Sequence, residues 1–122
     1  MSNEIFTPAK IEKRLYDLSK EIDDSHSELI EVESHYHSYK AHYEIAMAKS
    51  RMSYSMKSSP TGKNYTVQQV EALALIDNEE LHLRVAMAEA QVKGARANAG
   101  RVKTQVEIAR SMGTSVRASM EV

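Results

Sequence analysis

The fold of this chain is decided by residues 8–50, PAKIEKRLYDLSKEIDDSHSELIEVESHYHSYKAHYEIAMAKS. Apolar or small residues recur along this stretch in steps of three and four, which is the heptad spacing of a coiled-coil seam. Only Ser25 and Ser50 make the seam polar. Its positions are Ile11, Leu15, Leu18, Ile22, Ser25, Leu29, Val32, Tyr36, Tyr39, Tyr43, Ala46 and Ser50. The stretch therefore predicts one long helix with a continuous buried face.

The ends of this helix are marked by capping and breaking residues. The Thr7 hydroxyl can accept from a free backbone N–H, and Pro8 at the first helical position has no N–H to leave unpaired. The segment SSPTGKN, residues 58–64, collects helix breakers, and Pro60 disfavours helical backbone at the residue before it. We expect a flexible N-terminus over 1–6, a helix over 7–57 and a turn over 58–66.

A second helix is expected over 67–112, with a tail over 113–122. Thr66 and Gln69 have capping-box spacing, and Tyr65 and Val70 can form a hydrophobic staple across it. The seam of this helix is rich in Ala and comprises Val70, Ala74, Leu81, Val85, Ala88, Val92, Ala95, Ala99, Val102, Val106, Ala109, Gly113 and Val116. Gly94 and Gly100 each cost about 1 kcal/mol in a helix interior, so we expect close packing to recover the loss.

Two such helices predict an all-α, coiled-coil-like antiparallel hairpin. The second helix also carries a further apolar stripe, which one partner helix cannot cover. We therefore expect a homo-oligomer that uses Leu73, Ile76, Leu83, Met87, Ala90, Gly94 and Ala97. The alternative is a hairpin that splays or curls on itself.

Composition excludes several classes of protein. The chain has 122 residues, about one domain, with one Phe, no Trp and no Cys, so disulfides and Cys-ligated metals are absent. It has no apolar run of about 20 residues and no signal-peptide pattern, which favours a cytoplasmic protein, in the host cytoplasm if a phage encodes it. No phosphate loop, nucleophile elbow or metalloprotease motif occurs, so we expect no enzyme activity, cofactor or metal.

The net charge of −1 hides four blocks of alternating sign. Residues 1–34 hold four basic and nine acidic residues, net −5, and residues 35–63 hold five and one, net +4. Residues 64–92 hold one basic and five acidic residues, net −4, and residues 93–122 hold six and two, net +4. Folding the chain at its middle sets each block against one of opposite charge.

A histidine and tyrosine patch occupies the middle of the first helix. His35 and His37 are two residues apart, so on a helix they point about 200° apart and cannot share a metal ion. His35, Tyr39 and His42 do follow one face. Packing at an interface and binding of a ligand are both open for this face.

Cations alternate with tyrosines between residues 39 and 65. Cations neutralise phosphates and aromatic rings accept unstacked bases, so the pattern is typical of single-strand binding. Pairing of the same cations with the acidic residues at 71–80 explains them equally well. The candidate DNA-binding residues are Lys40, Lys49, Arg51, Tyr54, Lys57 and Lys63.

Residues 43–54, YEIAMAKSRMSY, resemble the Lys-Ala-Arg-Leu segment, followed by tyrosines, of the UvsY family of recombination mediators from T4-like phages. Residues 49–52 fall on the motif in order, and Tyr54 falls on its aromatic pair. The chain has Ser for Ala, Met for Leu and one Tyr for two, and its second helix is richer in Ala. Outside residues 40–65 the resemblance covers architecture only.

The resemblance implies a ring-like homo-oligomer that binds single-stranded DNA and helps a RecA-like recombinase replace the single-strand-binding protein. If the chain is similar to that family in function, its Lys49 and Arg51 would contact the DNA phosphates, with Lys57 and Lys63 beside them. The rival hypothesis is a structural or adaptor coiled coil, such as a phage assembly or inhibitor protein, whose basic blocks pair only within the hairpin. A metal-dependent enzyme built from histidines of several chains is a third. The number of subunits stays open.

Overall fold

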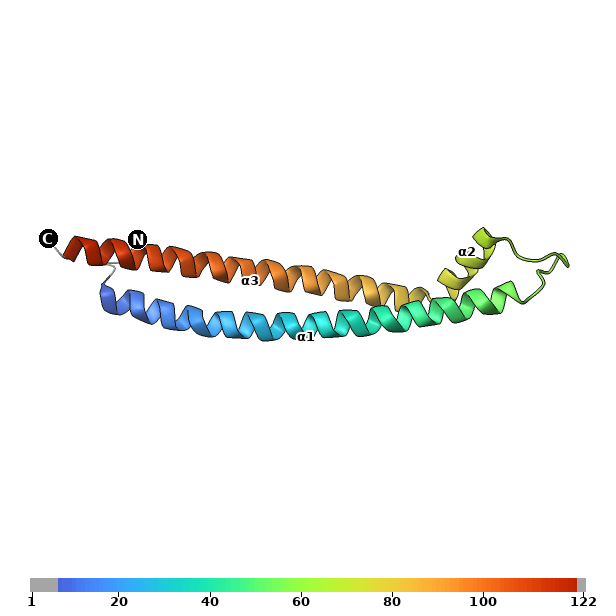
Figure 1. The fold of residues 1–122 in the computed structure, drawn as a ribbon, viewed down its shortest axis with the longest axis horizontal. Coiled ribbons are helices and arrows are strands. Elements are labelled where there is room, and N and C mark those ends of the chain that lie inside the picture. The colour runs from blue at the N-terminus through green and yellow to red at the C-terminus, as the bar shows by residue number, and fades with distance from the viewer. Residues whose placement is uncertain (1–6, 121–122) are drawn as a thin grey trace. The chain divides into compact units, whose positions relative to one another are not determined.

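The computed structural model describes residues 7–120, and over this range the chain is all-helical, as predicted. The helices are α1 (Pro8–Ser55), α2 (Val67–Asp77) and α3 (Glu79–Met120), shown in Figure 1. The described part contains no strand, and the loop between α1 and α2 holds a single antiparallel bridge between Ser58 and Asn64. The N-terminus predicted to be flexible, residues 1–6, lies outside the described residues, as do residues 121–122.

Local hydrogen bonds explain where α1 begins and ends. The Thr7 hydroxyl accepts from the Lys10 N–H at 3.3 Å, so the predicted start of the helix is confirmed to within one residue. After Ser55 the chain turns: the Gly62 N–H donates to the Ser59 carbonyl at 2.9 Å. Gly62 has φ +78°, a conformation that glycine adopts without steric cost.

The predicted second helix differs from the observed one in two ways. The capping box is present, since the Gln69 N–H donates to the Thr66 hydroxyl and the Thr66 N–H to the Gln69 side chain. The single helix over 67–112 is wrong, however, because Asn78 separates α2 from α3 with non-helical backbone angles of φ −112° and ψ 23°. The Asn78 side chain donates to the Ser50 hydroxyl at 2.9 Å and to the Ala74 carbonyl at 2.8 Å, which stabilises the break.

The segment expected as a tail, 113–122, is helical as far as Met120. Gly113 does not end the helix, because it is buried and closely packed. A Cβ built on it would lie 3.3 Å from Cγ2 of Ile11. A larger residue would push the two segments apart, so glycine here serves contact between helices.

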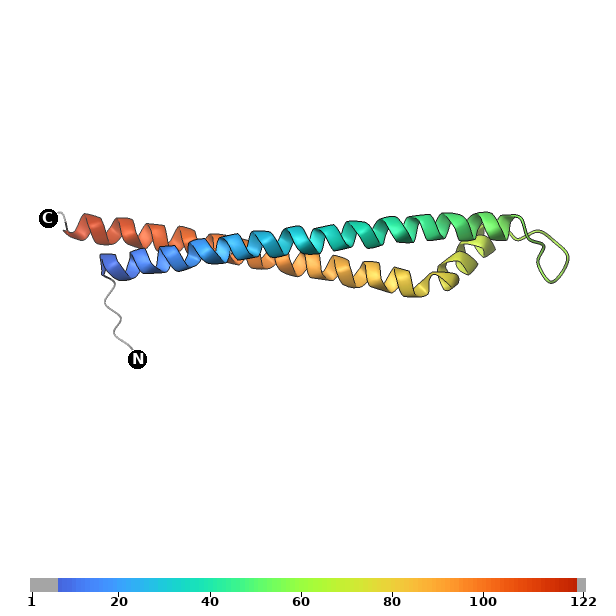
Figure 2. The same ribbon diagram turned by 90° about the horizontal axis from the view of Figure 1, so that it is seen from below.

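The chain divides into two compact units, the first formed by residues 1–31 and 93–122 and the second by residues 32–92. In the first, α1 and the C-terminal part of α3 run in opposite directions (Figure 2). Leu18 is fully buried against Val106 and Ala109, with Leu15 and Ile22 packed around them. The predicted polar flaw at Ser25 is buried and satisfied, because its hydroxyl donates to the Ile22 carbonyl at 2.9 Å.

In the second unit, the C-terminal part of α1 contacts both α2 and the start of α3. Met47, Val70 and Ala74 are buried there. The rings of Tyr43 and His82 lie 5.4 Å apart between α1 and α3. Every seam position expected from the heptad spacing in either helix is buried or half-buried, so the predicted seams are the faces on which the helices pack.

Candidate nucleic-acid interface

The six candidate DNA-binding residues all belong to the second unit. Lys40, Lys49, Arg51 and Tyr54 lie on α1, and Lys57 and Lys63 lie in the loop that follows it. All of them except Tyr54 are exposed, and Tyr54 is half-buried. On α1 the heptad seam explains this exposure, because Lys40, Lys49 and Arg51 flank the positions that pack against α2 and α3.

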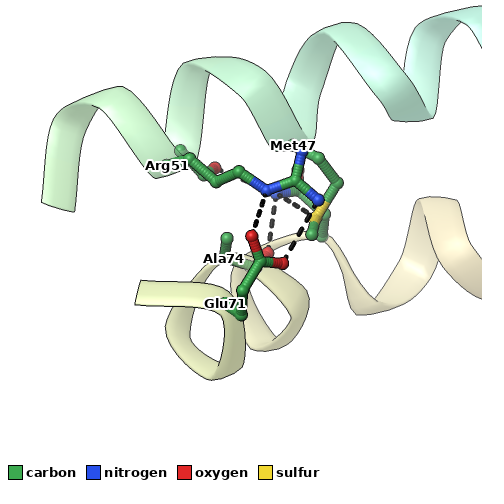
Figure 3. A network of polar contacts seen from close by, with 6 residues as sticks. Met47, Arg51, Glu71 and Ala74 are labelled. Atoms are coloured by element: carbon green, nitrogen blue, oxygen red, sulfur yellow. Dashed lines mark hydrogen bonds and ion pairs between the residues drawn. The ribbon is translucent and has the colours of Figure 1, made fainter. Parts of the chain in front are cut away.

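Arg51 is engaged within the chain (Figure 3). Its Nε lies 2.6 Å from Oε1 of Glu71 on α2, and its second terminal nitrogen donates to Oε2 at 3.2 Å. The two side chains are 46% and 50% exposed, so the pair is worth about 1 kcal/mol or less. An incoming phosphate can therefore compete with Glu71 for the guanidinium.

The side chains of Lys49 and Arg51 project from different sides of α1. They are two residues apart on α1, which separates their side chains by about 200° around the helix. Arg51 reaches Glu71 on α2, whereas Lys49 lines a groove with His42 on α1 and Arg84 on α3. The structure therefore does not bring the two motif cations together.

Tyr54 also has a carboxylate partner on α2. Its hydroxyl donates to Oδ2 of Asp77 at 2.6 Å, and this hydrogen bond is the main reason why the pKa of Tyr54 lies above its ordinary value. The ring meets Tyr65 edge-on with centroids 5.8 Å apart, and the Lys57 amine lies 5.5 Å from its centroid. Together these residues form a cation and aromatic cluster at the loop.

The segment from residue 45 to residue 70 is strongly basic. Residues 45–70 contain Lys49, Arg51, Lys57 and Lys63 and no carboxylate. Within residues 7–120, Arg51 is the one of these four cations that forms an ion pair. Lys40 lies apart from this group, with its amine 5.9 Å from the Tyr36 ring.

Arg84 lines the same groove as Lys49 and was not among the candidate residues predicted from the sequence. It is the single cation of the acidic block 64–92, and it forms an ion pair with Glu80 one turn earlier at 3.0 Å. Its signal in the sequence was weak, because an arginine four residues from a glutamate is ordinary on a helix surface. Its position in the same groove as Lys49 depends on how α1 and α3 pack.

The histidine and tyrosine patch lies on α1, where His35, His37 and His42 are exposed. His35 and Tyr39 stack with centroids 6.5 Å apart and planes inclined by 27°. Within residues 7–120, no group of three or more His, Asp or Glu side chains is arranged to hold a metal ion. Among the same residues, no helix is both long and apolar enough to cross a membrane.

The residues expected at an oligomer interface lie largely on the surface of the single chain. Ile76, Leu83 and Met87 are 66%, 57% and 58% exposed. Leu73 is half-buried, and the small members of the stripe, Ala90, Gly94 and Ala97, are exposed.

The glycines on α3 behave in two ways. A Cβ built on Gly94 or Gly100 would have no neighbour within 4 Å, unlike one on Gly113. Within the single chain, the close packing expected at Gly94 and Gly100 is therefore absent, whereas Gly113 is closely packed.

Comparison with known proteins finds no matching family model, no matching protein of curated function and no matching solved structure.

Proposed function

We propose that the chain is a single-stranded-DNA-binding recombination mediator of the UvsY type, which helps a RecA-like recombinase to replace the single-strand-binding protein. The proposal depends mainly on one observation, the basic segment formed by residues 45–70 of the second unit. Four cations lie within residues 45–70 without a carboxylate, beside Tyr54 and Tyr65. Lysines placed beside aromatic rings suit a single strand, which offers phosphates and unstacked bases together.

The proposed binding form is an oligomer of antiparallel helical hairpins. The support is the exposed apolar stripe on α2 and α3, where Ile76, Leu83 and Met87 are each more than half exposed. A second copy of the chain would remove these side chains from water. Several weak DNA sites held in one assembly gain affinity through effective concentration, which suits a chain with a net charge of −1.

The test is fluorescence anisotropy of a labelled single-stranded oligonucleotide at increasing salt, with a duplex of equal length as control. We expect preference for the single strand and a dissociation constant that rises with salt. The double variant Lys57→Ala, Lys63→Ala should flatten the salt dependence by about 0.7 in log–log slope per lost phosphate contact. The matched control is Arg101→Ala with Arg110→Ala, which removes two exposed cations of the first unit. Equal loss in both variants would contradict a localised site.

A structural or adaptor coiled coil is the second candidate function. The observation in its favour is that α2 carboxylates already engage two of the candidate residues, in the contacts Arg51–Glu71 and Tyr54–Asp77. This hypothesis expects assembly without affinity for single-stranded DNA at low salt. The same anisotropy experiment, combined with sedimentation, separates the two functions.

A further inference from the structure

Two adjoining grooves lie on one side of the second unit, between α1 and α3. The first has a volume of about 480 Å³ and is flanked by Lys49 and His42 from α1 and by Arg84 from α3. The second, of about 310 Å³, is lined by Met87 and shares Tyr39 and Arg84 with the first. Arg84 and Tyr39 therefore stand where the two grooves meet.

The cations of the first groove come from different helices. Lys49 is exposed, and within the described residues it has no ion pair. Arg84 uses one terminal nitrogen for Glu80, and the Arg84 and Glu80 side chains are 54% and 81% exposed. A guanidinium has five N–H donors, so this contact leaves Arg84 able to bind a second anion. The lining of this groove thus includes one cation from α1 and one from α3.

We propose that Lys49 and Arg84 together bind a backbone phosphate of single-stranded DNA in this groove, so that the functional partner of Lys49 is Arg84 and not Arg51. This inference rests on the proposed function. Charge complementarity identifies the occupant, since the groove combines Lys49 and Arg84 with the rings of Tyr39 and His42. Cations bind the phosphate, and the rings present aromatic surface to the neighbouring base. Arg51 points elsewhere, to Glu71.

The test compares Lys49→Ala, Arg84→Ala and their double variant by anisotropy on an oligothymidine. Each single variant should weaken binding about fivefold or more. The double variant should lose less than the product of the single losses, because both side chains serve one phosphate. Arg101→Ala is the matched control: Arg101 also lies exposed on α3 and hydrogen bonds to its own helix, through Asn98. Circular dichroism checks that helix content is kept.

The variant Glu80→Gln tests whether binding of the oligothymidine becomes tighter when the ion-pair partner of Arg84 is removed. Glu80→Gln removes the competing carboxylate, so it should tighten binding of the oligothymidine, and it should not do so when Arg84 is already alanine. If Arg84→Ala binds no more weakly than Arg101→Ala while the wild-type protein binds well, the groove assignment is wrong and the proposed function stands. If the wild-type protein binds no single strand at low salt, the proposed function fails, and the groove assignment fails with it.

Discussion

Gly94 and Gly100 offer a matched pair of substitutions on α3. Both glycines have negative φ, so alanine adopts their backbone conformation without strain. Within one chain, neither added methyl group would touch a neighbour within 4 Å. Alanine is favoured over glycine in a helix interior by about 1 kcal/mol, so Gly94→Ala and Gly100→Ala should each stabilise the folded chain by about that amount. At this chain length, 1 kcal/mol raises Tm by roughly 4 °C.

Gly113→Ala is the internal comparison. The new methyl group would lie 3.3 Å from Cγ2 of Ile11, closer than side chains normally pack, so part of the helix gain is lost in moving the two segments apart. We expect a gain smaller than at Gly94 or Gly100. The measurement is thermal unfolding followed by circular dichroism, which reports the helix content that all three variants share.

Measuring Tm at several protein concentrations distinguishes the stability of the single chain from the stability of the assembly. If Gly94 lies at the contact between copies, Gly94→Ala should lower association in sedimentation, and its gain in Tm should shrink as protein concentration rises. Gly100→Ala lies outside the proposed stripe and should show neither effect. A loss of stability in Gly100→Ala, or a gain in Gly113→Ala as large as in the other two, would refute the packing argument.

Three further substitutions test other contacts of the chain. Leu83→Glu places a charge on the exposed apolar stripe and should lower the assembly mass in sedimentation without loss of helix; an unchanged mass would remove Leu83 from the interface. Tyr54→Phe should remove tyrosinate formation above the ordinary tyrosine range in an ultraviolet pH titration, because the hydrogen bond to Asp77 raises the pKa of Tyr54. The hydrogen bond between Tyr54 and Asp77 stabilises the fold below about pH 10, and this stabilisation is lost as pH rises through the raised pKa of Tyr54. The stability difference between wild type and Tyr54→Phe should therefore vanish above that pKa. Glu71→Gln frees the Arg51 guanidinium and should tighten single-strand binding if Arg51 contacts the strand; no change would place Arg51 in a purely structural pair.

Most of the fold prediction rested on the periodicity of apolar residues and on helix-capping residues. Among the described residues, the heptad steps identified every buried apolar position except Met47, because a helix repeats its face every three to four residues whatever it packs against. The Thr66 capping box followed from local chemistry in the same way. The break at Asn78 did not, because its amide is held by Ser50, which lies 28 residues away along the chain.

The candidate site was only partly accessible from sequence. Clustering of Lys49, Lys57 and Lys63 near tyrosines follows from their spacing along the chain. That Arg51 meets Glu71 and that Lys49 shares a groove with Arg84 depends on contacts between α1 and the later helices. A sequence motif can place two cations two residues apart, but the helix then turns them to different neighbours.

The sequence by itself determined the helical class, the start of α1, the turn around Gly62 and the two packing faces, because these depend on interactions within a few residues. Tertiary structure alone decided which cations are paired, where α2 gives way to α3, and why Gly113 continues a helix instead of ending it. Each of those outcomes depends on a side chain from another helix: Glu71 for Arg51, Ser50 for Asn78 and Ile11 for Gly113.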